Sequence, residues 1–216
     1  VKVSFRDANL RYAGAGADSL SDITFDVAPG ETVGIIGGTG SGKSSLVNMI
    51  PRFYDASQGS VCIDGVDVKD YTLDELRHQV GVVPQKAVLF AGTIADNIRW
   101  GKQDATEAEI DEALEIAQAK EFVDGKENGI YFKITQGGKN LSGGQKQRLT
   151  IARAVVRKPE ILILDDSASA LDFATDAALR KAIREKTKGM TVFLVSQRAS
   201  TIMNSDKIIV MDDGQI

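Results

Sequence analysis

The sequence is poor in the residues that build covalent or metal-bound scaffolds. Its 216 residues include one cysteine, Cys62, and one histidine, His78. A single cysteine cannot form an internal disulfide and is typical of a chain kept in a reducing compartment. One cysteine and one histidine also cannot supply the four ligands of a structural zinc site. Disulfides and structural zinc are therefore excluded, and both residues are interpreted as structural.

The sequence also lacks long apolar runs and an excess of positive charge. No segment reaches the roughly 20 apolar residues that a membrane helix needs, and no signal peptide is recognisable, so a soluble segment is expected. The formal net charge of -4 and the pI of about 5.2 argue against nucleic acid as a general partner. Both ends abut strand or turn patterns, and we expect one domain excised from a longer polypeptide.

Hydrophobic patterning alternates between strands and helices along the chain. Residues 1–36 have the alternation of antiparallel strands, and three later apolar runs are typical of strands, at 161–164, 191–195 and 207–211. Helical spacing is expected at 43–53, 142–158 and 176–186, and capping-box spacing predicts helix starts at Thr72 and Thr106. This order predicts an α/β fold with a parallel sheet, interrupted by a helical lobe at about 90–155.

One glycine-rich loop has the pattern of a phosphate-binding loop, between a predicted strand and a predicted helix. Its residues are Gly37, Gly38, Thr39, Gly40, Ser41, Gly42, Lys43 and Ser44. Glycines let backbone N–H groups converge on phosphate oxygens, and the helix N-terminus adds partial positive charge. Lys43 is expected to reach the β- and γ-phosphates, and the Ser44 hydroxyl is expected to bind Mg²⁺. The flanking elements favour this interpretation over a glycine-rich turn without function.

Two further features suit a cation and an anion. Asp165 ends an apolar strand, and the carboxyl end of a parallel strand is where ligands bind in such sheets; a carboxylate there suits Mg²⁺. A second helix start has capping-box spacing with two glycines after its cap, which leaves backbone N–H groups accessible. Its residues are Ser142, Gly143, Gly144 and Gln145. The residues alone leave open whether it binds an anion or only caps a helix.

These motifs together resemble the ABC ATPase family over essentially the whole chain. The resemblance rests on the phosphate loop, on the segment 141–145, and on the run 161–165 followed by Ser169-Ala170-Leu171-Asp172. It implies a P-loop NTPase (RecA-like) core with an N-terminal antiparallel β subdomain and an inserted α-helical subdomain that carries the signature motif 141–145. The expected boundaries are about 1–86 and 156–216 for the core with its β subdomain, and about 87–155 for the helical subdomain.

The resemblance implies that two such domains pair head to tail and enclose ATP and Mg²⁺ between one phosphate loop and the other signature helix. It implies that Tyr12 stacks on adenine, although a strand aromatic without that role is the alternative, and that Asp172 lines the dimer seam. The implied nucleotide-binding residues are Tyr12, Gly37, Gly38, Thr39, Gly40, Ser41, Gly42, Lys43, Ser44, Ser45, Gln85, Ser142, Gly143, Gly144 and Gln145. The implied metal ligands are Ser44, Gln85 and Asp165, and the implied catalytic residues are Asp166, Gln197, Gln85 and Lys43.

The segment 83–101 is similar to the exporter branch of the family, where it docks on the coupling helices of a transmembrane domain. The resemblance therefore implies a transmembrane domain on the same polypeptide, and a place on the cytoplasmic face of the membrane. Within this segment Trp100 is interpreted as a core aromatic. The run 146–148 is interpreted as a solvated helix face and not as a nucleic-acid patch.

Three residues depart from the family pattern. Asp166 stands where the family places the glutamate that polarises the attacking water, and its carboxylate is about 1.5 Å shorter in reach. A general base must lie within roughly 2.6–3.2 Å of its proton donor, so this loss is large. Gln197 replaces a histidine and cannot be protonated, and Gln136 replaces a glutamate found in many exporters. The departures predict a site that binds ATP and hydrolyses it poorly.

Asp166 and Gln197 resemble the degenerate site of one subunit in bacterial heterodimeric multidrug exporters. The signature motif at 141–145 is intact, so it would complete the competent site of the partner domain. Two alternatives stay open. One is a homodimeric exporter with slow hydrolysis, and the other is a soluble ABC ATPase in DNA repair or translation. The long insertions of the latter class do not fit in 216 residues, which favours the exporter.

Overall fold

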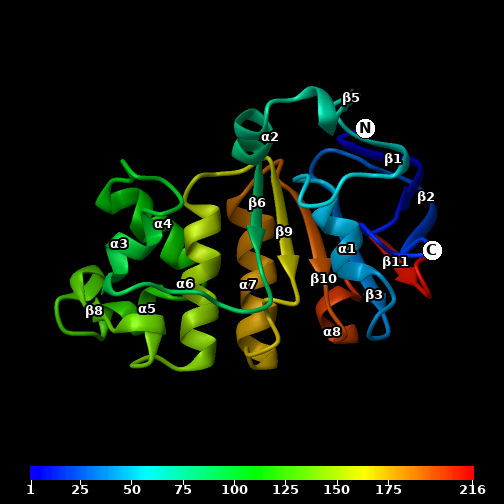
Figure 1. The fold of residues 1–216 in the computed structure, drawn as a ribbon. Coiled ribbons are helices and arrows are strands. Elements are labelled where there is room, and N and C mark those ends of the chain that lie inside the picture. Colours follow the sequence, from blue (N-terminus) through cyan, green and yellow to red (C-terminus); the bar gives the residue numbers. More distant parts are fainter. The chain divides into compact units, whose positions relative to one another are not determined.

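A computed structural model describes all residues, 1–216, and divides them into two compact units (Figure 1). The first unit contains Val1–Val80, Glu160–Asp165 and Gly189–Ile216, and the second contains Gly81–Pro159 and Asp166–Lys188. The first unit therefore collects three separate stretches of the chain.

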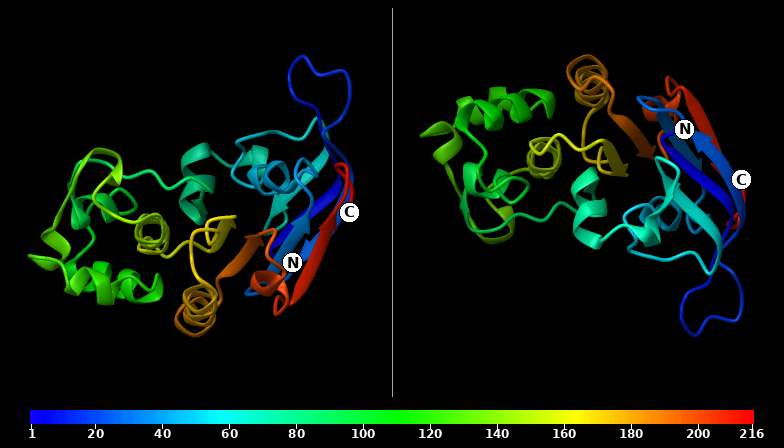
Figure 2. Two further views of the ribbon diagram at one scale, coloured as in Figure 1. Left: turned by 90° about the horizontal axis from the view of Figure 1, so that it is seen from below. Right: turned by 90° about the horizontal axis from the view of Figure 1, so that it is seen from above.

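The first unit contains an antiparallel sheet. Its strands, in the order β2-β1-β4-β5, are β1 (Val3–Leu10), β2 (Leu20–Val27), β4 (Gln58–Ile63) and β5 (Val66–Asp67). Phe5 of β1 stacks on Phe25 of β2, with ring centroids 4.6 Å apart, and Figure 2 shows the loop between these strands standing out from the sheet. The pair β1–β2 confirms the antiparallel start, whereas β4 and β5 were not predicted. Their signal was the Asp64-Gly65 turn, where both residues have positive φ.

The first unit also contains a parallel sheet, which confirms the predicted fold class. Within the unit its strands follow the order β11-β3-β10-β9. They are β3 (Thr32–Gly37), β9 (Ile161–Asp165), β10 (Thr191–Val195) and β11 (Lys207–Met211). All five residues of β10 are buried, as a strand between two neighbours and covered on both faces requires. The helices α1 (Lys43–Asn48) and α8 (Ala199–Ile202) contact this sheet.

The helix α1 is shorter than the predicted span 43–53. It ends at Asn48. Pro51 disfavours a helical conformation at the residue before it, Ile50, which lies two residues beyond the end of the helix. Arg52 then takes a left-handed conformation with φ of 60°, which turns the chain. After β5 come a 3-10 turn, η1 (Val68–Asp70), and α2 (Leu73–Gln79), which has the predicted capping box between Thr72 and Glu75. Strand β6 (Val80–Val83) carries the chain into the second unit.

The second unit is built mainly of helices. Its elements are β7 (Gly92–Thr93), α3 (Ile94–Ile98), α4 (Glu107–Ile116), α5 (Lys120–Asp124), η2 (Gly129–Tyr131), β8 (Lys133–Ile134), η3 (Gln136–Gly138), α6 (Gly143–Val155) and α7 (Phe173–Lys186). The helix α6 contacts α3 and α4, and α4 contacts α7; Figure 2 shows α6 end-on beside them. Capping boxes start α4 and α6 as predicted, and α7 begins earlier than predicted because Asp172 caps it. No helix is both long and apolar enough to span a bilayer.

The prediction that Trp100 is a core aromatic is wrong. Its side chain is 68% exposed, and it stacks on Phe90, itself exposed, with ring centroids 4.8 Å apart. The guanidinium of Arg153 lies 5.6 Å from the Phe90 ring centroid. Two aromatic rings are thus held against each other at the surface of the second unit.

Candidate functional site

The glycine-rich loop joins β3 to α1 in a conformation that depends on glycine. Gly40 and Gly42 have φ of 78° and 102°, a region that residues with a Cβ seldom occupy. A Cβ at Gly42 would also come within 2.7 Å of the Leu20 side chain. Gly42 is the N-cap of α1 and provides no side-chain hydrogen bond. The backbone N–H groups of the first turn are therefore not satisfied by a cap side chain, as an anion site at a helix start requires.

Lys43 is folded back onto the loop that precedes it. Its Nζ donates hydrogen bonds to the carbonyl oxygens of Gly37 at 2.6 Å and Gly38 at 2.9 Å. The ammonium charge is thereby held beside the backbone of the loop. An anion bound in the loop would meet both this charge and the start of α1.

Ser44 and Asp165 meet although 121 positions separate them in the sequence. The Ser44 hydroxyl donates to the Asp165 carboxylate at 2.9 Å, because α1 follows β3 and Asp165 ends β9 in the same sheet. Burial raises the pKa of Asp165, and the Ser44 hydrogen bond and the charge of Lys43 oppose part of that rise. A hydroxyl and a carboxylate are oxygen ligands of the kind Mg²⁺ takes, so this pair fits the predicted ion.

Gln197 lies beside the phosphate loop. Its Nε2 donates to the Thr39 hydroxyl at 3.4 Å, and both side chains are exposed. Gln197 follows β10, whose neighbour in the sheet is β3, the strand that leads into the loop. The structure thus brings one of the three departing residues to the predicted phosphate site as a neutral amide.

An open cavity of about 400 Å³ lies over the loop. It is lined by Tyr12, Asp18, Ser19, Gly40, Ser41, Gly42, Lys43, Ser44, Ser45 and Asp213. The Tyr12 hydroxyl is hydrogen bonded to the Ser45 hydroxyl, so the predicted base-stacking residue is joined to the predicted loop. Asp18, Ser19 and Asp213 were not predicted, because they belong to turns whose composition indicates no chemistry.

In the second unit the predicted signature motif starts α6. The Ser142 hydroxyl accepts from the Gln145 backbone N–H at 3.1 Å, and the Gln145 side chain accepts from the Ser142 backbone N–H at 3.1 Å. The reciprocal bonds confirm a cap. Gly143 and Gly144 follow directly, and a Cβ at Gly143 would meet only Ala170, at an ordinary 3.8 Å. The function of this helix start as an anion site stays a prediction.

The interpretation of 146–148 as a solvated face is wrong for two of its residues. Gln147 is 6% exposed. Its amide donates to the Gln85 carbonyl at 3.0 Å and accepts from the Ala170 backbone N–H at 3.2 Å. Arg148 donates to the Gln118 carbonyl at 3.0 Å, and burial lowers its pKa. The helix turns both side chains inward, which a run of three polar residues does not reveal.

Gln85, Asp166 and Asp172 also belong to the second unit. Gln85 is exposed, with its backbone carbonyl held by Gln147. Asp166 is half-buried and has a left-handed φ of 53°, and Asp172 caps α7 by accepting from the Thr175 backbone N–H at 2.7 Å. Their predicted roles toward nucleotide, metal and partner domain stay predictions.

Comparison with known proteins identifies relatives along the whole chain. A family model described as ABC transporter matches residues 20–169. An uncharacterised ABC transporter ATP-binding protein of Mycobacterium tuberculosis is 45% identical over 99% of this chain and 37% of its own length. An ATP-dependent lipid A-core flippase of Vibrio parahaemolyticus is 43% identical over 99% of this chain and 37% of its own length. A bacterial Atm1-family ABC exporter solved with ATP bound matches with a TM-score of 0.95 and 37% identity, over 100% of this chain and 38% of its own. The chain thus spans about 37% of the curated relatives.

Proposed function

The chain belongs to the ABC transporter family, and we propose that it is the ATP-binding domain of an exporter. In this proposal it binds ATP with Mg²⁺, pairs head to tail with a second such domain, and couples ATP binding and hydrolysis to export by a transmembrane domain. The relatives include a flippase and an exporter, which supports export as the process. The domain would work at the cytoplasmic face of the membrane.

The observation that carries the proposal is the cluster of Lys43, Ser44 and Asp165. Lys43 and the start of α1 place positive charge and backbone donors where a triphosphate would bind. The hydrogen-bonded Ser44 and Asp165 supply an oxygen ligand pair for the ion. Ser44 and Asp165 would hold Mg²⁺, which would supply positive charge against the negative charge of the phosphates. Gln85 is proposed as a further ligand that links this site to the transmembrane domain.

The base of the nucleotide is proposed to stack on Tyr12. The ring lines the cavity over the loop and is half-buried, and its hydroxyl is anchored on Ser45. A flat aromatic side chain at the mouth of a phosphate site gives contact area to any purine base, with little conformational entropy to lose. The remaining loop residues proposed to hold the phosphates are Gly37, Gly38, Thr39, Gly40, Ser41 and Gly42.

We propose that this chain's own ATP site is degenerate. Asp166 is too short to act efficiently as the base that orients the attacking water, and Gln197 can donate to a γ-phosphate oxygen but cannot carry a proton. The amide position beside Thr39 supports a binding role without acid–base chemistry. Weak hydrolysis is expected at this site, and the partner is proposed to be a different chain with a competent site.

The signature helix is proposed to act across the dimer interface. Gly143 and Gly144 offer backbone N–H groups at the start of a capped, 13-residue helix, which suits the γ-phosphate bound by the partner. The exposed pair of Phe90 and Trp100 supports docking of the transmembrane domain on the second unit, because contiguous exposed aromatic surface marks interaction sites. Gln147 ties Gln85 to the same helix.

The double variant Asp166→Glu with Gln197→His tests the degenerate site. ATP turnover is measured in the assembled exporter whose other site is disabled by replacing the partner's own phosphate-loop lysine. Restored acid–base groups contribute typically 10²–10⁴-fold, so we expect turnover to rise at least about tenfold above that background. Asp165→Asn added to the double variant is the control, and it should abolish the gain. If turnover does not rise although ATP still binds, then Asp166 and Gln197 are not the cause of weak hydrolysis. The proposal that the chain is an ATP-binding domain would still stand.

A further inference from the structure

We infer that Tyr54 is a positioning residue for the nucleotide base, acting through the ring of Tyr12. The inference rests on the proposed stacking of the base on Tyr12 and adds a residue outside the cavity lining. The rings of Tyr12 and Tyr54 form a T-shaped contact, with centroids 5.0 Å apart and an interplanar angle of 82°. Edge-to-face contacts of this geometry fix the orientation of both rings.

Tyr12 lies in a loop that offers it little else. The chain between β1 and β2 stands out from the sheet in Figure 2, and its neighbours 13–17 are exposed. Two contacts orient the side chain: the hydroxyl bonds Ser45 on α1, and the ring meets Tyr54. The hydroxyl contact fixes one end of the ring and leaves rotation about its long axis free. The contact with Tyr54 restrains that rotation, which sets the plane presented to a base.

Tyr54 is suited to this role because its backbone is held on one side by α1. The backbone N–H groups of Phe53 and Tyr54 donate to the Asn48 carbonyl at 2.9 and 3.4 Å. These bonds tie the turn to the end of the helix that begins at the phosphate loop. The base support and the phosphate support therefore share one element, and α1 sets the spacing between them.

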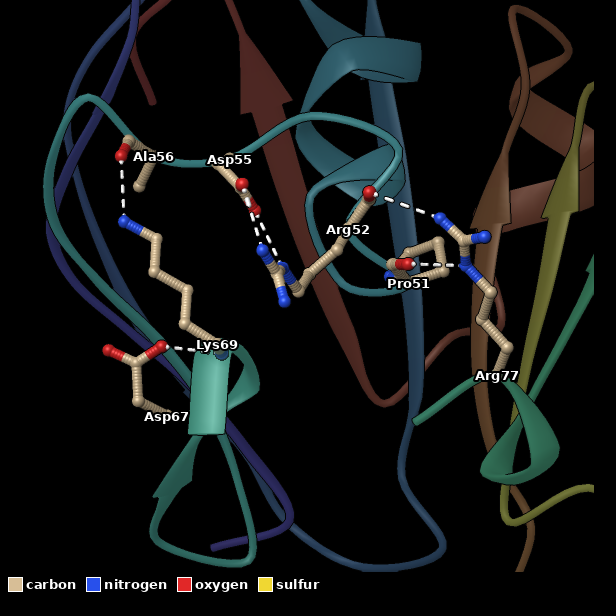
Figure 3. Close-up of polar contacts among 7 residues, drawn as sticks. All are labelled: Pro51, Arg52, Asp55, Ala56, Asp67, Lys69 and Arg77. Carbon is tan, nitrogen blue, oxygen red and sulfur yellow. Dashed lines mark hydrogen bonds and ion pairs between the residues drawn. The ribbon is translucent and has the colours of Figure 1, made fainter. Parts of the chain in front are cut away.

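Side chains from two other elements clamp the same turn, as Figure 3 shows. Arg77 of α2 donates to the Pro51 carbonyl at 3.2 Å and to the Arg52 carbonyl at 3.3 Å. Its guanidinium also lies 5.1 Å from the centroid of the Phe53 ring. On the far side of the turn, Lys69 donates to the Ala56 carbonyl at 3.1 Å. Carbonyl groups on both sides of Tyr54 are thus held by cationic side chains.

The turn is also held from within. Arg52 pairs with Asp55 through two hydrogen bonds of 2.8 and 3.1 Å, and this contact lowers the pKa of Asp55. Arg52 itself has a φ of 60°, a conformation that a non-glycine residue keeps only where its surroundings hold it. Yet Tyr54 is 39% exposed, so this bracing does not serve to bury it in a core. The bracing instead holds Tyr54 in place for its ring contact with Tyr12.

The test compares ATP with inorganic tripolyphosphate, a probe that has the phosphates and no base. Calorimetry with Mg²⁺ measures the Kd of each for the wild type, Tyr12→Ala, Tyr54→Ala and Tyr54→Phe. We expect Tyr54→Ala to raise the ATP Kd about three- to tenfold, because an aromatic pair contributes on that order. The tripolyphosphate Kd should stay at the wild-type value. Tyr54→Phe should retain tight ATP binding, since phenylalanine keeps the aromatic ring that contacts Tyr12.

A double variant and a control make the test specific. Adding Tyr54→Ala to Tyr12→Ala should cause no further loss of ATP affinity, since Tyr54 acts through Tyr12. Tyr131→Ala removes another exposed tyrosine, in the second unit, and should leave both Kd values unchanged. If Tyr54→Ala does not fold, as judged by circular dichroism, Tyr54→Leu keeps bulk without an aromatic edge and should give the same result.

The outcomes separate this inference from the proposed function. Wild-type ATP affinity in Tyr54→Ala, together with weakened affinity in Tyr12→Ala, would overturn the role of Tyr54 alone. Equal losses for ATP and tripolyphosphate would also overturn it, because they would mean that Tyr54 supports the loop and not the base. A Tyr12→Ala variant that binds ATP like the wild type would instead remove the proposed base site.

Discussion

Two helix starts in this molecule offer backbone donors, and they are built differently. The helix α1 begins after Gly42, which is left-handed and provides no side-chain cap. The helix α6 begins after Ser142, which forms a reciprocal capping box with Gln145. At α1 the first turn depends on an outside group to satisfy its donors, and Lys43 lies beside it. At α6 the Ser142 cap accepts the backbone N–H of Gln145. Only the N–H groups of the first two helical residues, both glycine, are left for an outside group.

The comparison shows that two helix starts with glycines can differ in what the glycines do. Gly42 is required by conformation and by contact, since its φ is 102° and a Cβ would meet Leu20 at 2.7 Å. At position 143 neither backbone conformation nor a contact within this chain requires glycine. A Cβ there would meet only Ala170, at 3.8 Å. A need for glycine at 143 must therefore come from something outside the chain. The proposed γ-phosphate of the partner's ATP is such a group.

The largest expected effect comes from a charge at the second helix start. Gly143→Asp would place a carboxylate against the partner's triphosphate, so we expect ATP turnover of the assembled exporter to fall by about 100-fold or more. ATP affinity of this chain's own loop should barely change. Steady-state turnover and calorimetry measure the two effects. Wild-type turnover in this complex would contradict the cross-interface role of α6.

At the first helix start the charge lies on the chain itself. Lys43→Ala removes the ammonium group held at Gly37 and Gly38, and we expect at least a tenfold loss of ATP affinity, about 1.4 kcal/mol. Lys188→Ala, which removes another exposed lysine, is the matched control. Calorimetry checks both. Equal ATP affinity in the two variants would refute the phosphate-binding role of the loop.

Replacing each of the two glycines by alanine tests whether the two helix starts differ in their need for glycine. Gly42→Ala forces a Cβ into a left-handed position and into Leu20, and should lower the free energy of unfolding by about 1–3 kcal/mol. Gly143→Ala should instead raise it by about 0.5 kcal/mol, because alanine loses less backbone entropy on folding. Urea unfolding measures both changes. A loss of stability in Gly143→Ala comparable to that in Gly42→Ala would mean that the two starts are alike.

The smallest expected effect concerns the pH dependence of Asp165. Burial raises its pKa above 3.8, so the folded chain holds this proton more tightly than the unfolded chain does. The resulting stabilisation is present below the unfolded pKa and is lost as the pH rises through the folded value. Asp165→Asn should therefore stabilise the nucleotide-free chain at pH 7, and this gain should shrink toward pH 4. A gain in Tm that does not depend on pH would contradict this account.

The sequence predicted much of the fold because its signals there are local. The runs at 161–164 and 191–195 became strands, since β-branched and leucine runs suit a sheet covered on both faces. The run 207–211 became the edge strand β11, whose residues alternate between exposed and buried. The capping boxes at Thr72, Thr106 and Ser142 also formed, because both of their partners lie within four residues.

Other features depend on contacts that the sequence pattern does not contain. The burial of Gln147 depends on the carbonyl of residue 85 and on the N–H of residue 170, which lie far from it in the chain. The exposure of Trp100 depends on where the loop after α3 turns. At the candidate site, Ser44 and Asp165 could be predicted to approach because both follow parallel strands. The pairing of Tyr12 with Tyr54 could not, because no local pattern relates these two residues, which lie far apart in the chain.

The buried amide of Gln147 also constrains how this domain can change by mutation. Its nitrogen donates to the Gln85 carbonyl, while its oxygen accepts from the Ala170 backbone. Among side chains of this length only glutamine offers a strong donor and a strong acceptor without charge. Glutamate would set a carboxylate against a carbonyl, and methionine would leave both backbone groups unsatisfied. The side chain of Gln147 therefore links the backbone at Gln85 to the backbone at Ala170, and a substitution at position 147 would affect both segments.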